Sequence, residues 1–129
     1  MKLSDITTDL EISKRLKEKG FPQDSMFSLY KHNNIEVVCQ IHDFNIESFG
    51  AISSPTAEEL LKELPRNIKV KDEKYPYWNI IDVDEKVYRV SYLHAMNKFS
   101  RLHNTEDKKL CNALALMWIY LHDDNLLKG

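Results

Sequence analysis

A wide apolar face near the C-terminal end is the feature that most constrains how this chain can fold. Apolar residues recur there at offsets of three and four: Leu110, Ala113, Leu114, Met117, Trp118 and Leu121. This spacing places them along one face of an α-helix. Further apolar residues widen the face: Cys111, Ala115, Leu116 and Ile119. A helix with so wide an apolar face lies on a sheet or is covered on two sides, so we expect it to hold the core.

The residues before this face predict where the helix begins. Asn104 or Thr105 can accept hydrogen bonds from the first free backbone amides of a helix. Glu106 and Asp107 would then lie in its first turn, where the helix dipole favours negative charge. We therefore predict one long helix over Asn104 to Leu127, with Trp118 at the centre of its buried face.

Length, charge and hydropathy limit the classes of protein to consider. The 129 residues suit one domain, which we predict to span residues 1–129. The 18 basic and 20 acidic residues give a formal charge of −2, so no global field attracts nucleic acid or an anionic membrane. No apolar run approaches the roughly 20 residues of a membrane span, and the acidic start, with Asp5 and Asp9, is unlike a secretory signal. These features favour a cytoplasmic protein without a membrane partner.

The two cysteines support the same compartment. Cys39 lies in a predicted strand and Cys111 in the predicted last helix, both among apolar residues. Buried free thiols are therefore favoured over a disulfide, which cytosolic proteins rarely contain.

Local signals divide the rest of the chain into helices and hairpins. Thr8 or Asp9 can begin a helix that Gly20 ends. Strands over 26–31 and 35–41 flank Asn33-Asn34, a plausible tight turn, and so predict a hairpin. Thr56 and Glu59 form a capping box for a second helix that Pro65 closes.

A second hairpin is predicted further along. Strands over 77–83 and 86–92 alternate apolar and polar residues around Asp84-Glu85. The runs 44–52 and 67–71 can add strands, and 93–103 holds either a helical turn or a loop over the core. The fold class is therefore α+β: a mainly antiparallel sheet of about four to five strands with about three helices, the C-terminal helix packed on the sheet.

Parts of the chain resemble a known group of proteins. The run Ile52 to Pro65, the stretch Ser13 to Phe21 and the closing segment Leu110 to Leu127 are similar to small phage- and prophage-encoded proteins of gut and soil bacteria. The shared motifs are helix starts and core stripes. The resemblance implies a cytosolic accessory protein of a mobile element and implies no reaction, so no functional residue is carried over.

The residues themselves give little sign of catalysis. The histidines show no spacing typical of a zinc site. His122-Asp123-Asp124 could share a metal, but a basic residue near a helix end followed by solvated acids is the favoured interpretation. Asp82 and Asp84 could act as a general acid and a general base, but the favoured interpretation places both at the tip of a hairpin. We predict no catalytic residue, no cofactor site and no metal site.

One charge pattern indicates an alternative surface. No carboxylate occurs from Lys86 through Thr105, whereas four cations and several aromatic residues do. Cations beside exposed aromatics suit nucleic-acid binding, and the candidates are Lys86, Arg89, Lys98 and Arg101. The competing interpretation buries the aromatics in the core and leaves the cations solvated.

Three functions follow in order of support. The first is a protein-interaction module whose unknown partner is another protein or a second copy of this chain, because the apolar residues exceed what a small core needs to bury. The second is nucleic-acid binding through the Lys86 to Arg101 region. The third is a metal-dependent hydrolase using His122 and its acidic neighbours.

Overall fold

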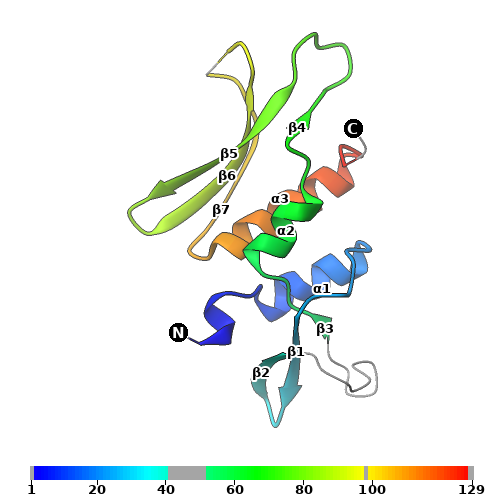
Figure 1. Cartoon of the computed structure of the whole chain (residues 1–129), viewed down its shortest axis with the longest axis vertical. Coiled ribbons are helices and arrows are strands. Elements are labelled where there is room, and N and C mark those ends of the chain that lie inside the picture. The colour runs from blue at the N-terminus through cyan, green and yellow to red at the C-terminus, as the bar shows by residue number, and fades with distance from the viewer. Residues whose placement is uncertain (1, 41–51, 98, 128–129) are drawn as a thin grey trace.

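The chain forms helices between two separate sheets (Figure 1). The computed structural model describes residues 2–40, 52–97 and 99–127. Within these ranges the elements in chain order are η1 (Leu3–Asp5), α1 (Leu10–Glu18), β1 (Phe27–His32), β2 (Ile35–Gln40), β3 (Ile52–Ser53), α2 (Ala57–Glu63), β4 (Asn67–Ile68), β5 (Tyr77–Asp84), β6 (Val87–His94), β7 (Arg101–Asp107) and α3 (Leu110–Asp123).

Both sheets are antiparallel. The smaller has the strand order β2-β1-β3 and the larger β4-β5-β6-β7. The α+β class and the packing of the C-terminal helix on a sheet are confirmed. The strands differ from expectation in that they divide between two sheets, which lie at opposite ends of the molecule with α1, α2 and α3 between them (Figure 1).

The predicted apolar face of α3 is the centre of the larger core. Every member of the stripe except Leu110 is buried, as are Cys111, Ala115 and Ile119. α3 contacts β6 and β7 on one side and α1 and α2 on others, which explains why its apolar face is wide. Residues from the other elements complete the cluster: Leu16, Phe21, Leu60, Leu64, Ile68, Tyr77, Val90 and Tyr92.

The predicted start of this helix is wrong. Asn104 to Asp107 belong to β7, and α3 begins at Leu110. The backbone of this stretch pairs with β6. The Thr105 hydroxyl, which was expected to accept from a free amide at the helix start, donates to the Ala113 carbonyl at 2.7 Å. A strand ladder that extends a sheet therefore outweighs a local capping signal.

The predicted end of the first helix and the predicted start of the second are confirmed, whereas α3 ends at Asp123 and not at Leu127. Gly20 has a φ of +88°, and the Phe21 amide donates to the Leu16 carbonyl at 2.9 Å, as expected for a glycine that ends a helix. At α2, the Thr56 hydroxyl accepts from the Glu59 amide, and the Glu59 carboxylate accepts from the Thr56 amide at 2.9 Å.

The first hairpin is confirmed, including its turn. Asn33 and Asn34 have φ values of +51° and +65°, a conformation that asparagine adopts at low cost. The second hairpin is also confirmed, but its two-residue turn is Glu85-Lys86, because Asp84 pairs with Val87. The predicted strand over 44–52 lies outside the described residues except for Ile52, which belongs to β3.

The connection over 93–103 is neither the helical turn nor the loop that we expected. β6 continues to His94, and β7 begins at Arg101 after a short turn. The His94 ring nitrogen Nδ1 accepts from the Met96 and Asn97 amides at 3.1 and 3.0 Å, which stabilises the reversal. The strand predicted over 67–71 is shorter than expected, because β4 covers only two residues.

Glu59 links α2 to the smaller sheet and gives a pH-dependent prediction. Its Oε1 accepts from the Ser25 hydroxyl at 2.7 Å, and its Oε2 accepts from the Met26 amide at 3.0 Å. Burial raises the pKa of Glu59, but hydrogen bonds with Thr56, Ser25 and Met26 outweigh burial and hold the pKa below its ordinary value of 4.5. The ionised form therefore stabilises the fold.

Replacing this carboxylate should cost stability only where it is ionised. We expect Glu59→Gln to lower the free energy of unfolding by about 1 kcal/mol at neutral pH. The deficit should shrink as the pH falls below 4.5 and through the lowered pKa, because the wild-type group then becomes protonated and neutral like glutamine. Urea unfolding over this pH range measures it. Glu63→Gln, on an exposed side of the same helix, is the control, and an equal loss there would contradict the prediction.

Candidate interaction groove

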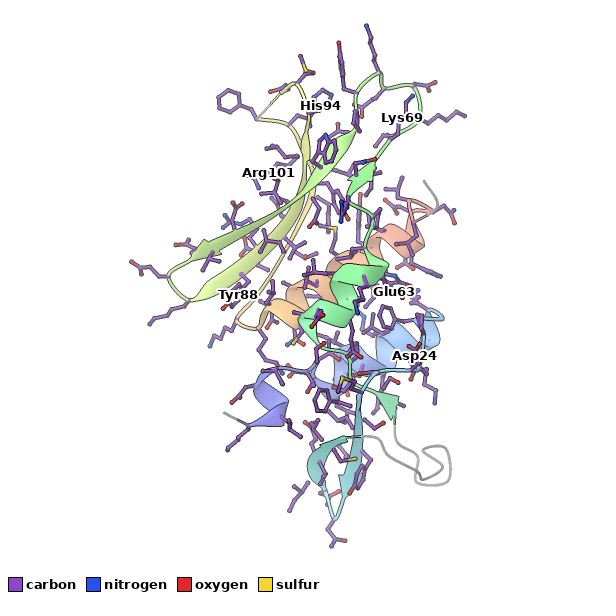
Figure 2. The ribbon with its side chains drawn as sticks, in the orientation of Figure 1. Asp24, Glu63, Lys69, Tyr88, His94 and Arg101 are labelled. Atoms are coloured by element: carbon purple, nitrogen blue, oxygen red, sulfur yellow. The ribbon has the colours of Figure 1, made fainter. Side chains whose placement is uncertain are left out.

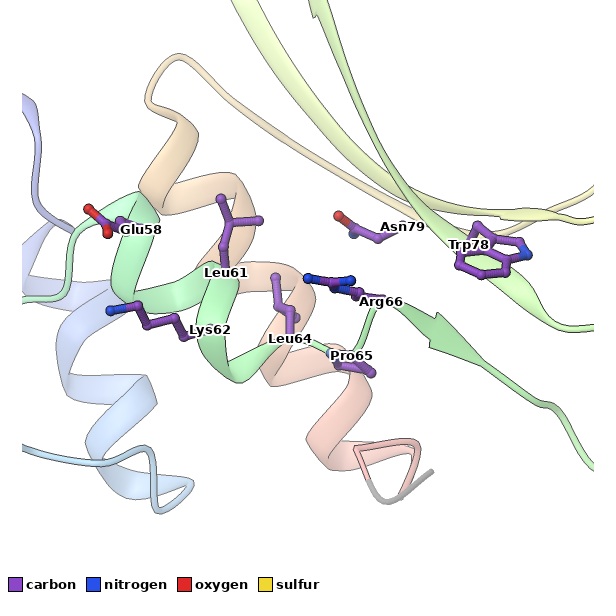
Figure 3. A pocket seen from close by; sticks show the side chains of 8 residues that line it. All are labelled: Glu58, Leu61, Lys62, Leu64, Pro65, Arg66, Trp78 and Asn79. Atoms are coloured by element: carbon purple, nitrogen blue, oxygen red, sulfur yellow. The ribbon is translucent and has the colours of Figure 1, made fainter.

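An open groove lies between α2 and the edge of the larger sheet. It has a volume of about 680 Å³, and we call it the α2 groove. Its lining residues are Glu58, Leu61, Lys62, Leu64, Pro65, Arg66, Trp78 and Asn79. Leu61 and Asn79 project into the space between α2 and β5, whereas Trp78 projects away from α2 (Figure 3). The groove thus combines an apolar wall from α2 with a polar group from the sheet.

The groove is open because the sheet extends further than the helices that cover it. Residues opposite each other in an antiparallel pair share a face, and Ile81 pairs with the buried Val90. Ile81 and Val83 therefore lie on the helix-facing side of β5, yet they are 36% and 71% exposed. Leu61 is 41% exposed on α2. Leu61 in the groove, and Ile81 and Val83 beyond it on the same face of β5 as Asn79, thus remain open to solvent.

A second groove continues past the other end of α2. It has a volume of about 650 Å³, and Glu58 lines both grooves, so they meet at the first turn of α2. Exposed Ile6 and Met26 contribute to its apolar wall. The remaining lining residues are Asp5, Phe27, Thr56, Ala57, Tyr88, Lys108, Lys109, Leu110 and Cys111. The two grooves therefore adjoin each other at Glu58.

The cations proposed for nucleic acid are placed differently from one another. Arg89 Nε donates to Glu106 at 2.7 Å. Arg101, which Figure 2 labels on the larger sheet, donates from Nη1 to Asp82 at 3.0 Å and to the Ser91 hydroxyl at 2.7 Å. The hydrogen bond with Glu106 raises the pKa of Arg89. Lys86 is in the β5–β6 turn, and Lys98 lies outside the described residues.

Strand pairing therefore supplies the carboxylates that the linear stretch lacks. Asp82 comes from β5 and Glu106 from β7, on either side of β6. Two of the four proposed cations already face an acid, so the local field available to a phosphate is weaker than the sequence indicates. Nucleic-acid binding stays a prediction, and a low-salt mobility shift with DNA and RNA, repeated with Lys86→Glu, tests it.

Comparison of the chain with protein-family models, curated proteins and solved structures finds no match. The resemblance to phage-encoded proteins stays a prediction.

The remaining candidate metal ligands and acids lie in separate contacts in the described part of the chain. No group of three or more His, Cys, Asp or Glu side chains within those ranges is placed to hold a metal ion. His122 stacks on Trp118 with 5.3 Å between ring centroids, and the neighbouring Asp123 pairs with Lys19 at 3.0 Å. Asp82 pairs with Arg101 as described. No helix within these ranges has the length and apolar character that spanning a bilayer requires.

The two described cysteines are both free thiols with different access to solvent. Burial raises the pKa of Cys111 to about 11, so its thiol stays protonated at neutral pH. We expect a water-soluble thiol reagent to modify the half-buried Cys39 first and to reach Cys111 only after denaturation. Peptide mapping by mass spectrometry measures this order. Rapid native labelling of Cys111 would contradict it.

The sequence analysis singled out neither Leu61 nor β5 as part of a surface. One signal was available, because Ile80 and Ile81 are adjacent and consecutive strand residues point to opposite faces. A strand with apolar side chains on both faces must either be covered twice or remain partly exposed. The predicted helices cover only one face of the sheet. Part of β5 therefore has to remain exposed to solvent.

Proposed function

We propose that this protein is a protein-interaction module that binds its partner in the α2 groove. The observation that supports the proposal is exposed apolar surface in and beside one concave feature: Leu61 of α2 lines the groove, and Ile81 and Val83, which follow the lining residue Asn79 along the same face of β5, are exposed as well. Exposed apolar patches bordered by polar residues are typical of sites that another protein covers. Glu58, Lys62 and Arg66 form such a border here.

The groove suits a protein segment better than a small ligand. Ligand sites enclose most of a small molecule within apolar walls. This groove is instead open along one side of a helix and continues into a second groove of similar volume. A shallow, elongated surface of this kind accommodates a peptide or a helix of a partner, whose length can follow it.

Comparative capture tests the proposal. Wild-type protein, Leu61→Glu and Met96→Glu are used as baits in extracts of the source cell, and the recovered proteins are compared by quantitative mass spectrometry. Met96 is exposed on the β6–β7 turn, away from the groove residues, so it is a matched control for an added acid. We expect a partner that wild type and Met96→Glu recover and Leu61→Glu loses by at least about tenfold. Equal recovery by all three baits would reject the groove as the site.

A further inference from the structure

β5 has an unpaired outer edge along half of its length. Its outer neighbour β4 pairs only with Tyr77 and Trp78, and the Asn79 amide donates to the Arg66 carbonyl at 2.9 Å. Beyond this point, no strand in the described ranges pairs with the outer side of residues 80–84. The sheet therefore ends in a stretch of open backbone next to the α2 groove.

The hairpin geometry shows which backbone groups are available at this edge. A two-residue turn is closed by a hydrogen-bonded pair, here Asp84 with Val87, and such pairs alternate along the ladder. Asp82 and Ile80 therefore bond to β6, whereas Ile81 and Val83 direct their N–H and C=O groups outward. The bond from the Asn79 amide to Arg66 follows the same alternation.

The two outer edges of the larger sheet differ in regularity. The pairing of β7 with β6 shifts register between Ser91 and Leu93, a bulge that twists an edge and hinders further pairing. β5 pairs with β6 without interruption from Tyr77 to Asp84. A regular edge is the better template for an added strand, so β5 is the favoured side.

We propose that the β5 edge binds an extended segment of a partner protein as a further strand, in which apolar residues alternate with lysine or arginine. This inference rests on the proposed function and specifies how the partner is held. The apolar residues of the segment would lie on the helix-facing side, beside Ile81 and Val83. That side continues directly into the groove, because Asn79 precedes Ile81 by two residues and lines it.

Charge on the other face of β5 favours basic residues in the segment. Asp82 and Asp84 alternate with the outward-bonding residues and so lie on the face away from the helices. Asp82 pairs with Arg101 at 3.0 Å, whereas the Asp84 carboxylate is exposed and, among the residues that the structure describes, accepts from the adjacent Glu85 amide at 2.8 Å. Opposite charges across a strand pair stabilise the pair, so a cation opposite Asp84 is favourable.

The same carboxylates disfavour a second copy of this chain as the occupant. If two copies paired their 80–84 stretches in full antiparallel register, Asp82 of one would lie opposite Asp82 of the other. Like charges directly opposite destabilise a strand pair. A register centred on Ile81 would instead need the backbone of Asn79, whose amide is already bonded to Arg66. A partner with basic residues meets neither obstacle.

Synthetic peptides test the proposal directly. A fluorescein-labelled peptide of alternating valine and lysine should bind wild-type protein, as measured by anisotropy. Matched peptides with glutamate in place of lysine, or with N-methyl groups on alternate backbone amides, should bind at least about tenfold more weakly. The N-methyl peptide keeps every side chain, so a weaker affinity of this peptide reports on the backbone hydrogen bonds alone. Equal binding of either matched peptide would overturn the proposal, as would no binding of the lysine peptide.

A proline on the protein side gives a second test. Val83→Pro removes an outward N–H that β6 does not use, so the β5–β6 ladder stays intact. It should weaken binding of the lysine peptide at least about tenfold, whereas Val83→Thr, which keeps the donor, should retain most of it. Unchanged binding to Val83→Pro would overturn strand addition.

Hydrogen exchange of individual amides gives the most specific readout. In the free protein, the Ile81 and Val83 amides should exchange quickly and those of Ile80 and Asp82 slowly. The lysine peptide should protect Ile81 and Val83. Protection of these two amides before peptide is added would overturn the proposal. If the peptides fail while Leu61→Glu still loses a captured partner, strand addition is rejected and the interaction module stands; if both fail, the proposed function is rejected too.

Discussion

Replacing Trp118 with alanine should lower the free energy of unfolding by about 3–5 kcal/mol, the largest loss that we expect from a single substitution in this chain. Trp118 is 5% exposed, and its ring meets Phe21 edge to face with 5.0 Å between centroids. Its loss removes apolar surface and leaves a cavity between α3 and the segment that follows α1. A domain of this size can lose most of its stability to such a change.

Denaturant unfolding followed by far-UV circular dichroism measures the loss, since the intrinsic fluorescence changes with the substitution itself. Trp78→Ala is the matched control, because that tryptophan is 46% exposed on the face of the sheet away from the helices. We expect the control to cost much less than Trp118→Ala. Similar costs for the two variants would show that α3 is not the centre of the core.

Asn112→Ala should cost about 1–3 kcal/mol, although it removes only a small polar group. Asn112 is 1% exposed on α3. Its Oδ1 accepts from the Asp9 amide at 3.0 Å, and its Nδ2 donates to the carboxylates of Asp9 at 2.9 Å and Asp107 at 3.1 Å. One side chain thus joins the start of α1 to the start of α3, and alanine would leave these partners without their bonds.

A double-mutant cycle separates this network from packing. Asn112→Ala and Asp9→Ala are measured singly and together, and we expect the double variant to cost less than the sum of the two single variants, because both remove the same bonds. Asn104→Ala, an exposed asparagine on β7, is the control. Additive losses at Asn112 and Asp9 would contradict a shared network.

The helices and the hairpins could be predicted because their signals are local. The α3 stripe, Gly20, the Thr56–Glu59 box and the Asn33-Asn34 turn each act within a few residues, and the structure confirms them. The start of α3 could not be predicted in this way. Glu106 and Asp107 look like a first helical turn, but their backbone pairs with β6, a partner more than ten residues away.

The candidate site was less accessible to sequence reasoning for the same physical reason. The stretch from Lys86 through Thr105 contains no acid, yet Asp82 and Glu106 reach Arg101 and Arg89 through strand pairing. Likewise, Leu61 belongs to an apolar helix pattern, yet it is exposed in the groove. The α2 groove and the unpaired edge of β5 depend on how far each helix and strand extends. The periodicity of apolar residues in the sequence does not determine these lengths.

The position of α3 in chain order has a consequence during protein synthesis. It follows α1, α2 and both sheets, yet it covers Leu16, Leu60 and Tyr92, which belong to these earlier elements. While the ribosome is still making residues 110–121, these side chains have no surface to pack against. A nascent chain of this protein should therefore recruit chaperones and remain sensitive to proteases until residues 110–121 have left the ribosome.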